Sequence, residues 1–257
     1  MNQHVNSTRF GRLLRKHTIE HLPSYAMSTA VLAGGVLVVR GALTYVTRRP
    51  LEHDLQQVLF IFGMLAAGAI FTSSVFAELG NPRGAAPALL LPASHFEKYL
   101  VAWLYSLPIF WVVYTAVFML VDFLVLEFGN QGWPHEMYDF SRGSSEWVGP
   151  LLSYALLHSV ALWGAIFFRR LHVIKTAFTL LGAFLLIIVI NLRLLKTLLP
   201  VQGVVMPFSN VWVGTGMQHM PVSLPDSQHH LILLGVPVAL ALLLWAAAYA
   251  RLTEKQI

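Results

Sequence analysis

Hydrophobic positions along this chain fall into six long runs separated by shorter polar stretches. Each run reaches or exceeds the roughly 20 residues that an α-helix needs to cross about 30 Å of hydrocarbon. The alternating ten-residue strands of a membrane β-barrel are not visible. The pattern predicts an all-α polytopic membrane protein, folded as a single transmembrane domain over residues 1–257. Its six predicted transmembrane helices span residues 24–46, 55–77, 99–126, 148–168, 173–192 and 231–250.

Residues 7–22, before the first run, show a different pattern. Apolar side chains at Phe10, Leu13 and Leu14 share one helical face. Cations fill much of the opposite face: Arg9, Arg12, Arg15 and Lys16. The pattern predicts an amphipathic interfacial helix lying along the anionic cytoplasmic leaflet. A loosely ordered basic tail is the alternative. No small-residue cleavage site follows a compact apolar core, so the segment is not a signal peptide.

Between the second and third runs lies the polar interruption Glu78–Lys98, ELGNPRGAAPALLLPASHFEK. Three prolines divide it, and Ser94 with Glu97 forms the capping-box pattern that starts a new helix. A simple turn between two membrane helices needs only a handful of residues. Since the stretch Ala86–Leu91 is apolar enough to bury, we interpret 78–98 as a structured element at the membrane surface that docks a partner.

Composition and charge agree with a membrane location and indicate its orientation. The chain is 56% hydrophobic and 11% charged, where soluble domains are about 25% charged, and its mean hydropathy is +0.65. The net charge of +5 is modest and does not indicate nucleic-acid binding. With both termini cytoplasmic, inner segments hold eleven Lys and Arg residues and outer segments five, Arg40 being counted in neither. The positive-inside rule therefore predicts cytoplasmic termini and a cytoplasmic 78–98 loop.

Chemical motifs are scarce. The chain has no GxxxxGK[ST] phosphate loop, no HExxH and no GxSxG, and it has no cysteine. Three polar side chains fall inside predicted spans: Arg40, Asp122 and His158. Such residues often serve transport or proton transfer, but pairing of Arg40 with Asp122, or snorkelling to the interface, removes most of the cost of burying these two charges. For His158, a hydrogen bond to a neighbouring helix is the interpretation we prefer over a haem or metal ligand, because no second histidine lies at membrane depth.

Two further features concern packing. Small residues recur within the spans and favour a tight bundle: Gly34-Gly35, Gly63, Ala66-Ala67-Gly68, Gly164-Ala165 and Gly182-Ala183. Before the last span, the outer segment contains the apolar stretch Val201–Gly214, which is too short to cross the membrane. We expect it to be re-entrant or to lie on the membrane surface.

Together, the six spans, the basic N-terminal helix, the structured loop after the second span and the long outer segment before the last resemble the permease subunit of an ABC exporter of the type-2 class. The resemblance is most specific at Phe76-Ala77-Glu78-Leu79, at Leu89-Leu90-Leu91-Pro92-Ala93-Ser94 and at Glu97-Lys98-Tyr99-Leu100, which are similar to the same loop in a bacterial group of such permeases. It covers the whole topology but is residue-specific over only about 25 positions.

The resemblance implies that the N-terminal helix and the 78–98 loop dock an ABC ATPase subunit, which binds ATP and Mg²⁺ while this chain holds no cofactor and is no enzyme. The docking residues that it implies are Glu78, Pro87, Leu89, Leu90, Leu91, Ser94, Glu97 and Lys98. It further implies a dimer with a second permease copy or a paralogue, in a bacterial inner membrane. Two alternatives stay open: a non-transporting scaffold that docks a soluble partner, and an intramembrane enzyme or haem-binding anchor.

Overall fold

The computed structural model describes residues 6–48, 51–80, 94–129, 144–168, 171–198, 211–213, 220–222 and 226–254. Six helical units in these ranges are long and apolar enough to cross a membrane, which confirms the prediction of an all-α polytopic membrane protein. The helices are α1 (Ser7–Thr47), α2 (His53–Gly80), α4 (His95–Leu104), the π-helix η1 (Tyr105–Ile109), α5 (Phe110–Gly129), α6 (Ser144–Phe167), α7 (His172–Leu198) and α8 (Asp226–Glu254). The unit α4–η1–α5 is the third span.

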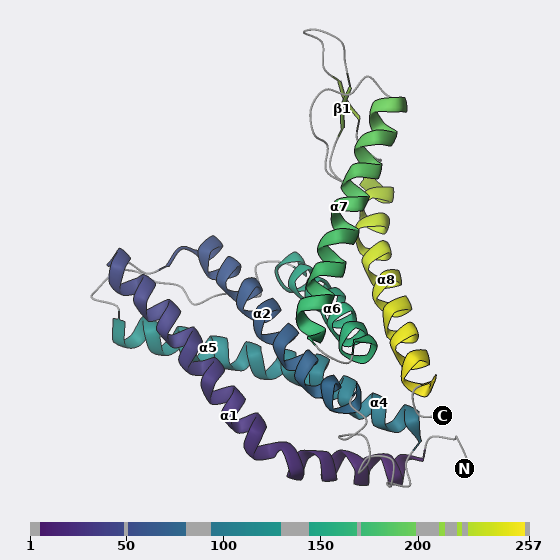
Figure 1. Cartoon of the computed structure of the whole chain (residues 1–257). Coiled ribbons are helices and arrows are strands. Elements are labelled where there is room, and N and C mark those ends of the chain that lie inside the picture. Colours follow the sequence, from purple (N-terminus) through teal and green to yellow (C-terminus); the bar gives the residue numbers. More distant parts are fainter. Residues whose placement is uncertain are drawn as a thin grey trace.

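The predicted interfacial segment and first span form the single helix α1. Asn6 caps it by accepting hydrogen bonds from the backbone N–H groups of Thr8 and Arg9, at 3.0 and 3.4 Å. Pro23 lies inside the helix, and α1 bends along its length (Figure 1), as expected where a proline removes a backbone donor. At 1.5 Å per residue the 41-residue helix is about 60 Å long. Because the hydrocarbon core is about 30 Å thick, roughly half of α1 lies outside it.

The third span is not a regular α-helix. Its π-turn η1 contains Pro108, which has no backbone N–H to donate. The hydroxyl of Tyr154 on α6 donates to the carbonyl oxygen of Ser106 in this turn. This hydrogen bond ties the irregular turn to α6.

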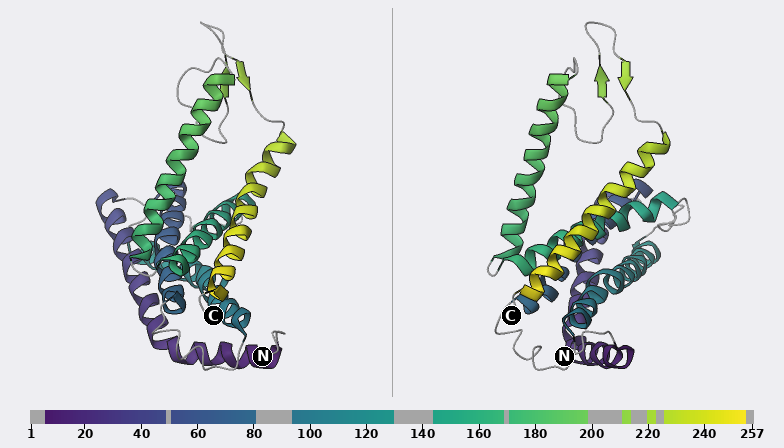
Figure 2. Two further views of the ribbon diagram at one scale, coloured as in Figure 1. Left: turned by 45° about the vertical axis from the view of Figure 1, so that its right-hand side comes forward. Right: turned by 90° about the vertical axis from the view of Figure 1, so that its right-hand side faces the viewer.

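The spans diverge into two arms that share α6. One arm consists of α1, α2 and α4–η1–α5, and the other of α7 and α8 (Figures 1 and 2). Helix α6 packs against α2, α7 and α8. Its close approach to α2 depends on Gly68, because a Cβ there would lie 2.3 Å from the ring of Tyr154. A Cβ at Gly164 of α6 would similarly lie 1.8 Å from the Thr176 hydroxyl of α7.

Among the described residues, three clusters of buried apolar side chains form the core, the smallest being Val117, Val121 and Val125 on α5. Of the two larger clusters, the first joins α2, α4, α6 and α8 at the cytoplasmic side of the predicted topology: Val75, Phe76, Tyr99, Ala102, Leu162, Ala165, Ile166, Ala248 and Leu252. The second joins α2, η1, α5 and α6: Phe60, Met64, Leu107, Phe110, Tyr114, Phe118 and Tyr154. The start of the third span therefore rests on the first cluster, which positions the site described below.

In the segment before the last span, the structure describes two short strands, β1 (Val211–Val213) and β2 (Met220–Val222). They pair antiparallel, with Val211 opposite Val222, next to the end of α7 (Figure 2). Of the stretch Val201–Gly214, expected to be re-entrant or surface-lying, only 211–213 is described, and these residues form a strand.

Candidate functional site: the junction of the N-terminal helix and the third span

The third span begins at a capping box. The hydroxyl oxygen of Ser94 accepts from the backbone N–H of Glu97 at 3.2 Å, and the Glu97 carboxylate accepts from the backbone N–H of Ser94 at 2.8 Å. These bonds satisfy two N–H groups that the first turn of a helix leaves without intrahelical partners. The capping box predicted from the sequence is therefore present, and it fixes the end of the 78–98 loop to α4.

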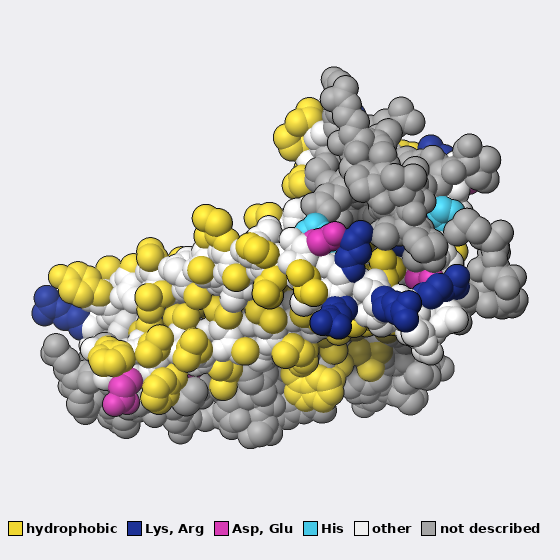
Figure 3. Space-filling view, turned by 90° about the horizontal axis from the view of Figure 1, so that it is seen from below, with side chains coloured by type: hydrophobic (Ala, Val, Ile, Leu, Met, Phe, Trp, Pro, Cys, Tyr) yellow, Lys and Arg dark blue, Asp and Glu magenta, His cyan; other side chains and the backbone are white. Residues whose placement is uncertain are grey.

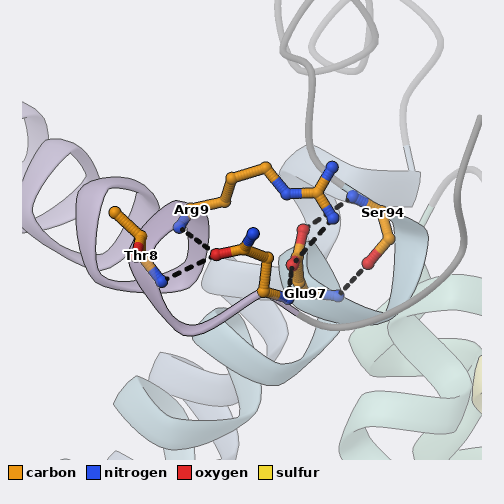
Figure 4. Close-up of polar contacts among 5 residues, drawn as sticks. Thr8, Arg9, Ser94 and Glu97 are labelled. Atoms are coloured by element: carbon orange, nitrogen blue, oxygen red, sulfur yellow. Dashed lines mark hydrogen bonds and ion pairs between the residues drawn. The ribbon is translucent and has the colours of Figure 1, made fainter.

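The same carboxylate also binds the N-terminus of α1. Its second oxygen accepts from the backbone N–H of Asn6 at 2.9 Å and lies 3.5 Å from Nη2 of Arg9. Figure 4 shows Glu97 between Arg9 on α1 and Ser94, the residue that caps the start of α4. The Glu97 side chain is fully buried. One buried acid thus joins two segments about ninety residues apart in the sequence.

Electrostatics favour the ionised form of this carboxyl group. Glu97 lies in the first turn of α4. Burial alone disfavours a charged carboxylate, but the hydrogen bonds from the N–H groups of Asn6 and Ser94 and the charge of Arg9 stabilise it. At neutral pH the junction therefore holds a carboxylate that accepts on both oxygens.

Further along α1, the apolar face of the 7–22 segment lies against the protein rather than only against lipid. Phe10 and Leu13 are partly buried. The Thr18 hydroxyl hydrogen-bonds the Tyr105 hydroxyl, and the rings of His17 and Tyr105 lie 4.8 Å apart. The interfacial helix is therefore attached to the third span at two levels, Glu97 and Tyr105.

The cations of this segment lie on its other side. Arg12, Arg15 and Lys16 are exposed, and Lys16 lies 3.4 Å from Glu20 on the same helix. Seen from below, hydrophobic side chains cover the middle of the molecule and most of the Lys and Arg side chains gather toward one end (Figure 3). Such a surface fits an anionic membrane leaflet or an acidic partner surface.

Several predicted docking residues lie outside the described residues: Pro87, Leu89, Leu90 and Leu91. Glu78 lies in the last turn of α2, and Lys98 is partly buried in the first turn of α4. The sequence did not single out Asn6 or Tyr105. A backbone N–H donor carries no signal in a sequence, and one tyrosine among many aromatic residues in a membrane span is not distinctive.

The structure brings Arg40 and Asp122 together as an ion pair between α1 and α5. Both side chains are buried, at 2% and 0% exposure, and the Arg40 guanidinium lies 4.8 Å from the centre of the Phe118 ring. Two charges that are costly singly thus compensate each other and tie two helices together.

His158 lies in a hydrogen-bonded network between three helices. Its Nδ1 accepts from the indole N–H of Trp245 on α8 at 3.1 Å, and its Nε2 lies 2.8 Å from the Ser106 hydroxyl. Since Nδ1 accepts, Nε2 carries the proton and donates to Ser106, whose hydroxyl donates to the Ala102 carbonyl at 2.8 Å. Both ring nitrogens are therefore engaged within the protein. Within the described ranges, no group of three or more His, Cys, Asp or Glu side chains is placed to hold a metal ion.

Comparison of the chain with protein-family models, with curated proteins and with solved structures finds no match.

Proposed function

We propose that this chain is the transmembrane permease subunit of an ATP-driven ABC-type exporter. It works as a dimer and is coupled to a separate ATPase subunit through the 78–98 loop. The observation that carries the proposal is the buried Glu97 carboxylate, which fastens the N-terminal helix and the end of that loop to the start of the third span. The sequence resemblance supports the same assignment.

The mechanical reasoning starts from the rigidity of this junction. A partner that moves the 78–98 loop moves Ser94, and the capping box transmits the displacement to α4. Because Glu97 also binds Asn6, α1 moves with it. Movement of a cytoplasmic partner is thus passed to two spans at once, as ATP-driven transport requires.

An exposed small residue supports a second copy. A Cβ at Gly182 would have no heavy atom within 4 Å, so this position on α7 does not pack within the protomer. Small residues permit close helix contact in membranes, and the dimer places this face of α7 against another permease chain.

The experiment is co-purification with the ATPase encoded beside this gene, followed by ATP turnover in lipid nanodiscs. We expect a stable complex whose turnover depends on the permease. Leu90→Asp should abolish the complex while the protein remains inserted, because a charge replaces an apolar contact. A matched control is Leu171→Asp, at an exposed position with positive φ that aspartate tolerates.

Failure of any ATPase to associate with the wild-type chain refutes the transporter assignment. That result would favour the alternative of a non-transporting scaffold, because the same junction also suits docking of a partner that is not an ATPase. Equal association of the wild type and Leu90→Asp instead refutes only the assignment of the loop.

A further inference from the structure

A groove of about 600 Å³ lies between α1, α2 and the η1–α5 part of the third span. This volume is in the range of ligand sites in proteins, about 300–1,000 Å³. The groove belongs to neither the Glu97 junction nor the Arg40–Asp122 pair. All three bordering elements are parts of predicted membrane spans, so its surroundings are lipid.

The lining of the groove changes character along its length. At one end it is lined by residues that carry hydroxyl groups: Ser24, Tyr25, Ser28, Thr29, Ser74 and Tyr105. The hydroxyls of Tyr25, Tyr105 and Ser74 also hydrogen-bond within the protein, to His17, Thr18 and the Phe71 carbonyl. The other end is formed by apolar residues: Val31, Leu32, Ala67, Ile70, Ile109, Phe110 and Val113. Since α1 and the third span both leave the Glu97 junction and α2 runs back toward it, the hydroxyl end is the one next to the N-terminal helix.

The length and polarity of the groove match a lipid chain. From Ser24 to Leu32 the helix rises about 12 Å, which is most of one leaflet of a hydrocarbon core about 30 Å thick. An acyl chain placed there has its methylenes against the apolar wall and its ester oxygens beside the hydroxyl groups. The apolar end of the groove offers no polar groups to a soluble polar ligand.

Positive charge near the hydroxyl end of the groove, which we call its mouth, favours an anionic headgroup. The rings of His17, His21 and Tyr25 pack together where α1 enters the groove, with His21 and Tyr25 stacked at 5.7 Å. The segment of α1 that precedes the mouth carries four cations and the single acid Glu20, and Arg9 among these cations is bound to Glu97. Lys16 lies 3.4 Å from Glu20, so Arg12 and Arg15 are the cations that give the mouth a positive field.

We propose that the groove binds one acyl chain of an anionic phospholipid from the cytoplasmic leaflet, whose headgroup is held by the cations of the N-terminal helix. This binding does not depend on the transport assignment, because it uses only the described residues of one protomer.

The test uses the full chain in phosphatidylcholine nanodiscs that contain phosphatidylglycerol with a diazirine on one acyl chain. The matched probe is phosphatidylcholine with the same diazirine. After photolysis, mass spectrometry maps the labelled peptides. We expect the phosphatidylglycerol probe to label residues 24–32 and 105–113 in preference to the phosphatidylcholine probe.

Variants separate the groove from the general lipid-facing surface. Val31 lines the groove and Val38 does not, yet both are 69% exposed on α1. Val31→Trp should remove most of the labelling and Val38→Trp should leave it unchanged. Replacement of Arg12 or Arg15 by Gln should lower phosphatidylglycerol labelling by about fivefold for each cation removed, with no change for phosphatidylcholine.

Equal labelling by the two probes identifies an annular lipid only and overturns the proposal, as does labelling that is insensitive to Val31→Trp. The chain has no cysteine, so Val31→Cys provides a unique thiol. Efficient disulfide cross-linking of Val31→Cys between two copies in the membrane shows that a second protomer fills the groove, and it too overturns the proposal.

Discussion

Replacing Glu97 by glutamine tests the junction with the smallest change of shape. The carboxylate accepts from two backbone N–H groups, those of Asn6 and Ser94, through different oxygens. An amide keeps one acceptor and presents its NH₂ group to the other donor. Glu97→Gln therefore loses one charge-assisted hydrogen bond, weakens the second and leaves a buried N–H group without an acceptor.

The size of the effect follows from these contacts. A hydrogen bond to a charged group contributes about 1.5–3 kcal/mol. The Arg9 guanidinium adds little, because at 3.5 Å and 36% exposure it is screened by solvent. A net loss of roughly 2 kcal/mol corresponds to an increase of about 30-fold in the equilibrium constant for detachment of the α1 terminus. The core clusters are untouched, so insertion and overall folding should persist.

Hydrogen exchange in nanodiscs measures this detachment. We expect the amides of residues 6–10 to lose about 30-fold in protection, whereas those of 160–166 in α6 do not change. The control Glu20→Gln removes the exposed Lys16 pair and should have little effect. Unchanged protection of residues 6–10 in folded Glu97→Gln protein would falsify the junction as a mechanical link.

Two other substitutions probe the bundle. Asp122→Asn leaves Arg40 buried without its countercharge and should lower the stability by about 3–5 kcal/mol, measured as a lower Tm in nanodiscs. The double variant Arg40→Met with Asp122→Leu should recover most of the lost stability. An unchanged Tm in Asp122→Asn contradicts the pairing. Gly63→Ala places a Cβ 2.4 Å from the Tyr114 hydroxyl and displaces its 2.9 Å hydrogen bond to the Phe60 carbonyl, for a loss of about 1–3 kcal/mol. Gly35→Ala, which meets no atom within 4 Å, is the matched control and should be neutral or slightly stabilising, because alanine has the higher helix propensity. An equal loss in both variants would mean that the loss at Gly63 does not come from its contact with Tyr114.

The local features of the fold could be predicted from the sequence. Spans were readable because hydrophobicity over about 20 residues is a strong signal, and the capping box was readable because Ser94 and Glu97 are three positions apart. The observed helices mostly extend beyond the predicted spans. For example, α7, expected at 173–192, continues to Leu198. Polar residues just beyond the hydrocarbon can continue a helix, and hydropathy does not show where such a helix stops.

Most long-range contacts could not be predicted from the sequence, although the Arg40–Asp122 pair and a hydrogen bond from His158 to a neighbouring helix were among the possibilities it offered. Nothing near Glu97 in the sequence indicates that it accepts from Asn6, because the pairing depends on how α1 bends and packs. The π-turn at Pro108 was also missed, since an apolar run around a proline gives the same hydropathy as an unbroken helix. The small residues were only partly informative: Gly63, Gly68 and Gly164 meet neighbouring side chains, and Gly34, Gly35 and Gly182 do not. Which face of a helix meets its neighbours is decided by tertiary packing.

The most direct measurement concerns the side of the membrane on which the 78–98 loop lies. Because the chain has no cysteine, Ala86→Cys introduces a single thiol into the loop, and Gln202→Cys introduces one into the outer segment as a control. With a membrane-impermeant maleimide, Ala86→Cys should react in inverted membrane vesicles and not in intact cells lacking an outer membrane, and Gln202→Cys should show the reverse. Reaction of Ala86→Cys from outside intact cells would contradict the account, because no cytoplasmic ATPase could then reach the loop.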